Sequence, residues 1–281
     1  MPTYDVHQHL WPEQVVEVLR GRRRPPRLQR NVLELDEGSF PVDLREHELD
    51  ARLALLDRDG IDVAVVSLPP TLGWEHHPEL ADAYHAGIRE LAAASGGRLR
   101  PLACGTCLEG FAGACVSAAA FLGRLGALPD ELERAGQVLF VHPGPPGAAP
   151  EDAPSWWTAL VPYTAQMQAA YLAWVADVGE RHAGLTVVFA ILAGGAPIQL
   201  ERLHSRGVEP RSALHPSVHL ETSSYGRRAL ELCLKAHGVA QLLYGSDAPV
   251  IDSRPTLQAL SELGGAVQHA VLSENPTRLF A

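Results

Sequence analysis

The chain has 281 residues, of which 46% are hydrophobic and 20% are charged, and its formal net charge at pH 7 is −10. This length fits either two domains or one large α/β barrel. The acidic balance argues against a nucleic-acid partner, and no apolar run reaches the roughly 18 residues needed to cross a membrane. The four cysteines fit a reducing compartment and no secretory leader is visible, so we expect a cytoplasmic protein.

Short apolar runs alternate with helix-period segments along the chain. Buried, β-branched strands that alternate with helices predict a parallel sheet, and eight such strands predict a closed barrel. We therefore expect an α/β fold, a distorted (β/α)8 TIM barrel that takes up residues 1–281 as a single domain. The predicted strands are 3–7, 62–68, 99–104, 112–116, 138–142, 186–191, 218–221 and 241–244. The predicted helices are 47–59, 78–95, 129–135, 162–182, 197–205 and 226–237.

Two histidines, His7 and His9, lie at the end of the first predicted strand. Side chains two residues apart on a strand point to the same side, so Asp5, His7 and His9 are expected to line one face. Two imidazoles held in this way form half of a transition-metal site. The alternative is that two of the 13 histidines lie two residues apart by chance.

Residues 20–43 follow directly on this histidine motif. They carry six arginines around Pro25-Pro26 and then an acidic, turn-rich stretch. In a barrel, such a segment would overhang the C-terminal mouth. We expect a lid-like insertion whose arginines, including Arg24, bind a substrate carboxylate in a bidentate way. The alternative is a solvated surface loop.

The connection between the third and fourth predicted strands is short. About seven residues separate Cys104 from Ala112, whereas a parallel crossover usually needs a dozen or more. Either one of these strands is wrong or the barrel lacks a helix at this place.

Two further polar residues end predicted strands. His142 ends the run 138–142, and Asp247 follows the run 241–244. The C-terminal ends of barrel strands converge on one mouth, so His7, His9, His142 and Asp247 are expected to meet there. Three nitrogens and one carboxylate oxygen suit Zn²⁺, with Mn²⁺, Fe²⁺ or Co²⁺ as alternatives. For each residue alone, the ordinary alternative is a capped polar group at a strand end.

These residues lie in motifs that resemble the amidohydrolase superfamily, in its amidohydrolase 2 branch related to aminocarboxymuconate-semialdehyde decarboxylase. The resemblance implies a distorted (β/α)8 barrel with one divalent metal, usually zinc, and it places His7, His9, His142 and Asp247 at the metal positions. The motifs run in family order from residue 5 to residue 280: Asp5-x-His7-x-His9-x-x-Pro12, Phe140-Val141-His142-Pro143, Gly194-Gly195, Tyr244-Gly245-Ser246-Asp247-x-Pro249 and Asn275-Pro276-x-Arg278-Leu279-Phe280.

The sequence departs from the family at the end of the sixth predicted strand. The family commonly has a histidine there, which polarises a substrate oxygen or helps to activate water. Ile191 stands at the expected position and can do neither. We expect an apolar wall near the metal, with Asp247 left to carry the proton transfers.

Three more residues are candidates for substrate contacts. Tyr163 and Gln166 lie in the helix-prone stretch after His142, where the spacing also fits an ordinary buried helix face. Tyr225 follows Glu221 at the end of the seventh predicted strand, and its alternative role is local turn capping.

Three functions are compatible with these residues. The sequence favours a metal-dependent hydrolase of a small carboxylated or cyclic substrate, such as an amide or lactone, with metal-activated water and Asp247 as acid and base. The first alternative is a non-oxidative decarboxylase of a small unsaturated or aromatic acid, with Asp247 as the proton donor to carbon. The second alternative, suggested by Ile191, is a metal-binding barrel without catalysis. The expected partner is a small anionic molecule, and a homodimer is left open.

Overall fold

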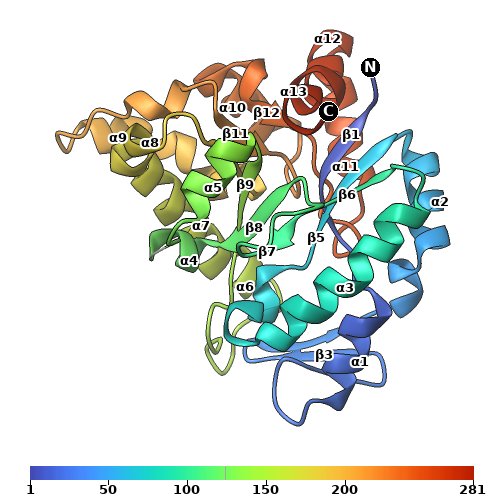
Figure 1. Cartoon of the computed structure of the whole chain (residues 1–281). Coiled ribbons are helices and arrows are strands. Elements are labelled where there is room, and N and C mark those ends of the chain that lie inside the picture. Colours follow the sequence, from blue (N-terminus) through green and yellow to red (C-terminus); the bar gives the residue numbers. More distant parts are fainter. Residues whose placement is uncertain (124) are drawn as a thin grey trace.

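The computed structural model describes residues 1–123 and 125–281, and within them eight parallel strands form a barrel (Figure 1). One sheet has the order β1-β5-β6 and a second has the order β12-β11-β10-β9-β8-β7. Segments β6 and β7 are one strand interrupted at Leu102, so all eight predicted strands are present. The strands are β1 (Tyr4–His9), β5 (Val63–Ser67), β6 (Leu99–Pro101), β7 (Ala103–Cys104), β8 (Gly113–Ser117), β9 (Val138–His142), β10 (Thr186–Phe189), β11 (Val218–Glu221) and β12 (Leu242–Leu243).

The ring closes where β1 meets the chain that follows β12. The N–H of Val6 donates to the carbonyl of Tyr244 at 2.9 Å, and the N–H of His9 donates to that of Ala248 at 2.8 Å. In the opposite direction, the N–H of Asp247 donates to the carbonyl of His7 at 2.8 Å. We call this pairing of residues 6–9 with residues 244–248 the closing seam.

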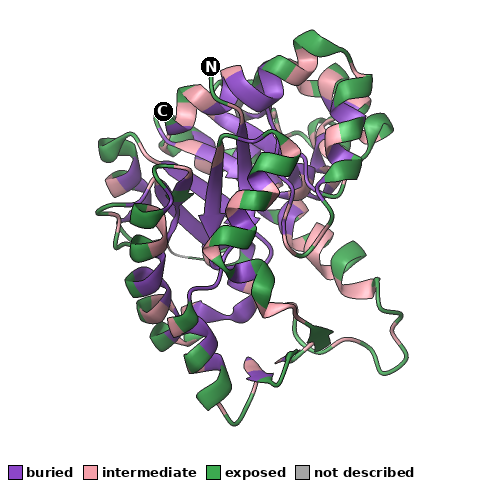
Figure 2. Ribbon diagram, turned by 90° about the vertical axis from the view of Figure 1, so that its right-hand side faces the viewer, coloured by how far each residue is buried: buried purple, intermediate pink, exposed green. Residues whose placement is uncertain are grey.

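Helices cover the outside of the barrel, and each of the six predicted helical segments contains one. Figure 2 shows the buried strands at the centre and helices whose outer faces are exposed. Helix α3 illustrates the cause, because Leu80, Tyr84 and Ile88 are spaced four apart and form one buried stripe. The helices are α1 (Glu13–Gly21), α2 (Leu49–Asp59), α3 (Pro78–Ala94), α4 (Ala118–Leu122), α5 (Leu128–Ala135), α6 (Trp157–Leu160), α7 (Pro162–Ala173), α8 (Gly179–Arg181), α9 (Leu200–His204), α10 (Arg227–His237), α11 (Arg254–Glu262), α12 (Gly265–His269) and α13 (Asn275–Phe280).

The short connection between β7 and β8 has no helix, although both strands are present and pair in parallel. Helix α3 fills the place of the missing helix. Its Arg89 donates to the carbonyl of Glu109 at 3.2 Å and lies over the ring of Phe111. Its His85 accepts the N–H of Cys104 at 2.8 Å. The loop is therefore held by side chains of the preceding helix.

Residues 20–43 form a small antiparallel sheet where the sequence suggested a loop. After α1, strands β2 (Arg27–Gln29), β3 (Val32–Leu35) and β4 (Gly38–Pro41) pair in the order β2-β3-β4. Figure 1 shows α1 and β3 beyond the C-terminal ends of the barrel strands. The turn between β3 and β4 reaches α7, because the hydroxyl of Tyr163 donates to Oε1 of Glu37 at 3.2 Å. We call residues 20–43 the mouth segment.

Three arginines of the mouth segment are bound by the protein itself, and the first of them, Arg20, pairs with Glu13 at 3.4 Å. Arg22 pairs with Glu79 and donates to the carbonyl of Pro26 at 2.6 Å. Arg27 pairs with Glu34 at 2.6 Å on the neighbouring strand. Arg24, in contrast, is exposed to solvent. The same described ranges, 1–123 and 125–281, contain no helix that is long and apolar enough to cross a membrane.

Candidate metal centre

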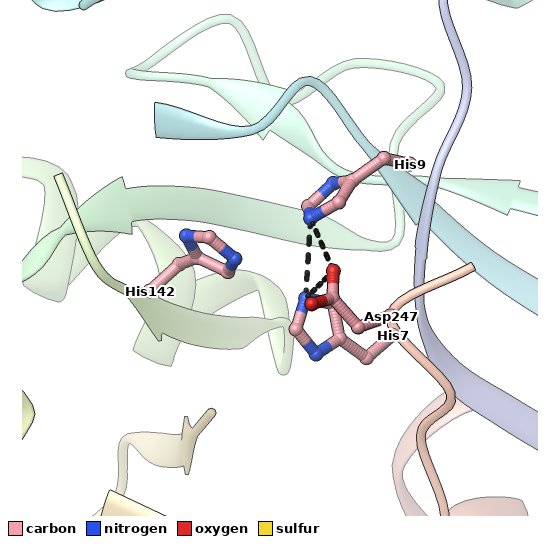
Figure 3. A group of neighbouring side chains, drawn as sticks. All are labelled: His7, His9, His142 and Asp247. Carbon is pink, nitrogen blue, oxygen red and sulfur yellow. Dashed lines mark hydrogen bonds and ion pairs between the residues drawn. The ribbon is translucent and has the colours of Figure 1, made fainter. Parts of the chain in front are cut away.

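Four side chains at strand ends converge inside the C-terminal mouth (Figure 3). His7 and His9 lie at the end of β1, His142 ends β9, and Asp247 follows β12. One ligand atom from each lies within 4.8 Å of the others. The four residues expected from the sequence are therefore brought together.

Each histidine is oriented by an oxygen on its Nδ1 side. Nδ1 of His7 lies 2.8 Å from Oε2 of Glu221, and Nδ1 of His142 lies 2.8 Å from the carbonyl of Pro143. Nδ1 of His9 lies 3.3 Å from the carbonyl of Ser67. A carbonyl accepts only, so Nδ1 of His9 and of His142 is assigned the proton, and a carboxylate favours the same for His7. The lone pairs of all three Nε2 atoms are then available to a cation.

The three imidazole rings are nearly perpendicular to one another. Each pair of ring centroids among His7, His9 and His142 is 5.0 Å apart, and the interplanar angles are 83–86°. Nε2 of His7 and Nε2 of His9 are 3.3 Å apart. An ion with bonds of about 2.0–2.1 Å in a tetrahedral site places neighbouring ligand atoms about 3.3–3.4 Å apart. The spacing fits a first-row divalent metal.

Asp247 supplies the observation that tests this fit. Its Oδ1 is buried without a hydrogen-bond donor, although it lies 3.1 Å from Nε2 of His9 and 3.6 Å from Nε2 of His7. When the imidazoles are neutral and carry their proton on Nδ1, this oxygen and the two nitrogens are all acceptors that face one another. A buried acceptor without a partner costs about 1–3 kcal/mol. A cation held between these atoms removes that cost, so the donor set fits a metal.

The backbone holds Asp247 in an uncommon conformation. Its φ is 61°, in the left-handed region, which aspartate tolerates better than most residues. The N–H of Asp247 donates to His7, and its carbonyl accepts the N–H groups of Val250 and Ile251. These bonds fix the carboxylate on the side of the closing seam that faces the histidines.

The protein groups alone already shift the titration of these residues. Burial alone would lower the pKa of His7, but the carboxylates of Glu221 and Asp247 outweigh it and raise the pKa to about 9. Burial lowers the pKa of both His9 and His142. Burial tends to raise the pKa of Asp247, but the neighbouring histidines outweigh it and lower that pKa. His7 is thus the group that must release a proton when a cation binds.

Glu221 has a role that the sequence did not reveal. Besides His7, its carboxylate accepts the hydroxyl of Ser223 at 2.8 Å and the N–H of Ser223. The chain after β12 packs directly against it, because a Cβ at Gly245 would lie 2.2 Å from Oε1 of Glu221. From the sequence, Glu221 was expected only at the end of the seventh predicted strand, before Tyr225, since nothing in the sequence pairs residue 221 with residue 7.

Asp5 does not line the histidine face as the strand alternation predicted. The register of β1 against β5 shifts between Asp5 and Gln8, so the alternation is broken by an extra residue. The carboxylate of Asp5 instead accepts Nε2 of Gln8 at 2.7 Å and the N–H of Ser246 at 3.0 Å. Asp5 therefore lies behind the metal cluster.

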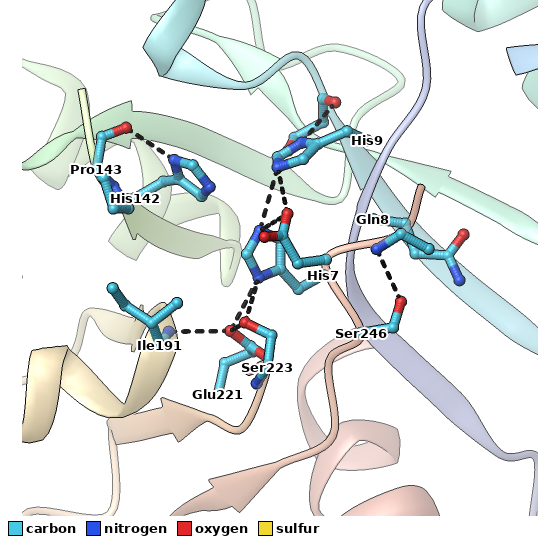
Figure 4. Close-up of polar contacts among 12 residues, drawn as sticks. His7, Gln8, His9, His142, Pro143, Ile191, Glu221, Ser223 and Ser246 are labelled. Atoms are coloured by element: carbon cyan, nitrogen blue, oxygen red, sulfur yellow. Dashed lines mark hydrogen bonds and ion pairs between the residues drawn. The ribbon is translucent and has the colours of Figure 1, made fainter. Parts of the chain in front are cut away.

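Ile191 lies in a turn, two residues after β10 ends, so the predicted strand end at residue 191 is wrong. Its φ is 48°, and Leu192 and Ala193 are also left-handed, at 49° and 52°. Such conformations cost roughly 1–2 kcal/mol per non-glycine residue. The N–H of Ile191 donates to Oε2 of Glu221 at 3.1 Å, and Figure 4 shows its side chain extending toward the side where His142 lies. At Gly194 a Cβ would lie 2.4 Å from the carbonyl of Thr164, so glycine is required.

The other candidate residues differ in their surroundings. Tyr163 is partly buried on α7 and contacts the mouth segment through Glu37. The amide of Gln166 bonds to both backbone groups of Gly144, at 2.8 and 3.3 Å, so it holds the loop after His142. Tyr225 is partly buried beyond β11, with its N–H on the carbonyl of Thr222.

Several solved structures share this fold over nearly the whole chain. IDCase of Metarhizium anisopliae, in an apo form, has a TM-score of 0.83 at 19% identity and covers 99% of this chain and 97% of its own. The 5-carboxyvanillate decarboxylase of Sphingomonas paucimobilis has a TM-score of 0.76 at 16% identity, with coverage of 100% and 99%. A dihydroxybenzoic acid decarboxylase of Polaromonas sp. JS666, with bound manganese and the inhibitor 2-nitroresorcinol, has a TM-score of 0.75 at 16% identity, with coverage of 99% and 96%. These likenesses confirm the barrel fold.

Sequence comparison identifies the family. No curated protein sequence matches the chain. A family model described as amidohydrolase matches residues 4–281, from the histidine strand β1 to the end of the chain. The chain therefore belongs to the amidohydrolase family, in its amidohydrolase 2 branch.

Proposed function

We propose that the chain is a metal-dependent, non-oxidative decarboxylase of a small aromatic or unsaturated acid. The sequence favoured hydrolysis, but the similar structures named above include decarboxylases of aromatic acids. The observation that carries the proposal is the metal-binding geometry of three inward Nε2 atoms and the unpartnered Oδ1 of Asp247, next to an isoleucine. Asp247 could pass one proton in either reaction, from water to a leaving group in hydrolysis or from a substrate hydroxyl to carbon in decarboxylation. The preference for decarboxylation therefore rests on the similar structures.

His7, His9, His142 and Asp247 would hold one divalent ion per chain. When bound, the ion supplies a Lewis acid that holds and polarises an oxygen of the substrate. Zinc suits this mixture of nitrogen and carboxylate donors, and manganese is present in two similar structures. We propose one of these two, with Fe²⁺ and Co²⁺ as alternatives.

The proton chemistry centres on Asp247. The nearby histidines lower its pKa, so Asp247 starts as a carboxylate and must first accept a proton. A hydroxyl on the substrate supplies that proton, and Asp247 then delivers it to the carbon that bears the carboxylate. The bond to the carboxylate breaks, its electron pair stays with that carbon, CO₂ leaves, and the substrate oxygen regains a proton from solvent. Hydroxylated acids therefore fit best.

The surrounding residues would complete the substrate site. Ile191 offers an apolar surface to a ring, and Tyr163 and Tyr225 are partly buried and available for ring or hydroxyl contacts. Arg24, which lies in the mouth segment, would attract the carboxylate of the substrate. Gln166 would act indirectly, by holding the loop after His142. The partner is then a small anionic acid, and the cytoplasm remains the expected location.

The test is turnover with two sets of substrates. Protein loaded with Zn²⁺ or with Mn²⁺ is mixed with hydroxybenzoic acids, including dihydroxybenzoate and 5-carboxyvanillate, and CO₂ release is measured. A parallel set of lactones and amides is followed for hydrolysis. The proposal expects CO₂ release that is lost in Asp247→Asn, even where that variant still holds metal. Turnover confined to lactones or amides would restore the hydrolase, and metal binding without any turnover would favour the non-catalytic barrel.

A further inference from the structure

Arg52 is a fully buried arginine directly behind the closing seam. It lies on α2 with 1% of its surface exposed, and its guanidinium bonds to the chain at several points. Nη2 donates to the carbonyl of His9 at 2.9 Å and to that of Glu46 at 3.1 Å. Nη1 donates to the carbonyl of Ala248 at 3.3 Å and to Oε1 of Gln8 at 2.6 Å. One side chain thus holds both sides of the seam.

The contacts continue from Gln8 to the backbone of the metal ligands. Nε2 of Gln8 donates to Asp5 at 2.7 Å, and Asp5 accepts the N–H of His7 at 3.2 Å and the N–H of Ser246 at 3.0 Å. Figure 4 shows Gln8 and Ser246 on the side of the seam away from His142. We call Arg52, Gln8 and Asp5 the seam clamp. On the seam, the clamp binds backbone groups of His7 and His9, and of Ser246 and Ala248, which flank Asp247.

We infer that the seam clamp is a positioning group that sets the separation between the β1 histidines and Asp247, and through it the affinity of the metal centre. The separations at issue are 3.1 Å from Nε2 of His9 to Oδ1 of Asp247 and 3.6 Å for His7. The inference rests on the proposed metal centre. It assigns to Arg52 a function that no ligand residue performs, because His7 and His9 lie on one segment and Asp247 on another, and the guanidinium of Arg52 binds carbonyl groups of both.

Arginine is the side chain suited to this position. Its planar fork presents five donors and reaches several carbonyls at once, whereas lysine is a point charge. Burial lowers the pKa of Arg52 to about 10, which leaves the guanidinium charged at neutral pH. Charged donors form stronger hydrogen bonds to carbonyl groups than neutral donors do. Without the guanidinium, the carbonyl of His9 would lose the donor that Arg52 supplies, and the carbonyl of Ala248 would keep only the N–H of His9.

The test compares Arg52→Gln with Leu56→Ala in the full-length protein. Leu56 lies one turn further along α2, is also fully buried, and makes no polar contact with the seam. Leu56→Ala should lower the free energy of unfolding by about 2–5 kcal/mol. It therefore controls for the stability that Arg52→Gln is expected to lose. Two quantities are measured well below the melting temperatures: the Kd for Zn²⁺ by chelator competition, and the d–d absorption spectrum of bound Co²⁺, which reports ligand geometry. Gln8→Met, which breaks the clamp at its centre, is measured in the same way.

We expect Arg52→Gln to weaken Zn²⁺ binding by about tenfold to a hundredfold and to alter the Co²⁺ spectrum, as loss of outer-shell support does elsewhere. Leu56→Ala should keep the wild-type Kd within about twofold. If Arg52→Gln does not fold, Gln8→Met must show the same two effects. A wild-type Kd and spectrum in the folded clamp variants would overturn this inference but not the proposed metal centre. An equal loss of affinity in Leu56→Ala would do the same. A wild-type protein that binds no metal would overturn the metal centre and this inference together.

Discussion

Oε2 of Glu221 lies 2.8 Å from Nδ1 of His7 and also accepts the N–H of Ile191 at 3.1 Å. One oxygen thus links a histidine of the proposed metal centre to the left-handed turn that begins at Ile191. The bond to His7 fixes the ring so that Nε2 faces the cluster. The bond to Ile191 helps to hold a turn whose backbone is strained.

Replacement of Glu221 by glutamine should weaken metal binding. Glutamine keeps the size of the side chain but removes the charge that fixes and polarises His7, and such losses typically reduce metal affinity about tenfold to a hundredfold. Chelator competition with Zn²⁺ measures the effect. Ser223→Ala is the comparison, because it removes a hydroxyl that donates to Glu221 at 2.8 Å and lies 3.3 Å from Nδ1 of His7 but leaves the carboxylate in place, and it should change affinity less. Equal affinity in Glu221→Gln and wild type would contradict the role of Glu221.

Metal affinity should depend on pH through His7. The pKa of His7 is raised to about 9, so below that pH a proton occupies the nitrogen that the metal requires. The apparent affinity should rise about tenfold per pH unit up to about pH 9 and then level off. Competition titrations between pH 6 and pH 10, corrected for the chelator, measure this slope. An affinity that does not change with pH would show that His7 binds the metal without losing a proton.

The stability of chelator-treated protein should change in the opposite direction. A histidine whose pKa is raised in the folded state stabilises the protein fully below its unfolded pKa, near 6.5, and this stabilisation is lost as pH rises toward about 9. The melting temperature without metal should therefore fall across this range. Thermal scans with and without metal should separate further as pH rises. Parallel curves would contradict the prediction.

Ile191→His should fold and should not lower the melting temperature. Isoleucine is β-branched and fits a φ of 48° poorly, whereas histidine is found more often in the left-handed region. The side chain is also only partly buried, so the exchange leaves no large cavity. Ile191→Val keeps the β-branched strain and serves as the control. A melting temperature for Ile191→His well below that of Ile191→Val would show that the Ile191 side chain is needed for packing.

Arg24→Gln should weaken the binding of a hydroxybenzoate about tenfold, because it removes an exposed positive charge that would attract the carboxylate. Metal affinity should stay unchanged, because Arg24 is not one of the four candidate ligands. Calorimetric titration of the metal-loaded protein with the acid measures the first quantity, and chelator competition measures the second. Arg45→Gln is the control, since Arg45 is also exposed but pairs with Asp43 at the far end of the mouth segment. Equal binding by both variants would return the mouth segment to the alternative of a solvated surface.

The sequence predicted the barrel because buried β-branched runs such as Val138–His142 are long enough to be recognised one by one. The four candidate ligands could be predicted because each lies at a strand end. Asp5 was misplaced, since the register shift in β1 arises from pairing with β5 and leaves no local signal. The strands of the mouth segment are only three or four residues long and rich in charge, so they resembled a loop.

Two further features depend on contacts between distant segments. Glu221 meets His7 across 214 residues and Arg52 meets Ala248 across 196, so spacing in the sequence cannot reveal either pair. The turn at Ile191 was read as strand because its residues are apolar. Its left-handed backbone follows from the bond to Glu221 and from the close approach of Gly194 to Thr164.

The most direct test of the metal centre is the metal content of the purified protein, measured by elemental analysis. The account predicts about one divalent ion per chain in the wild type, a strong loss in both His7→Ala and His142→Ala, and full content in Arg45→Gln, which lies outside the cluster. A wild-type protein that holds no metal and takes up none on titration with Zn²⁺ or Mn²⁺, or histidine variants that retain it undiminished, would contradict the central claim.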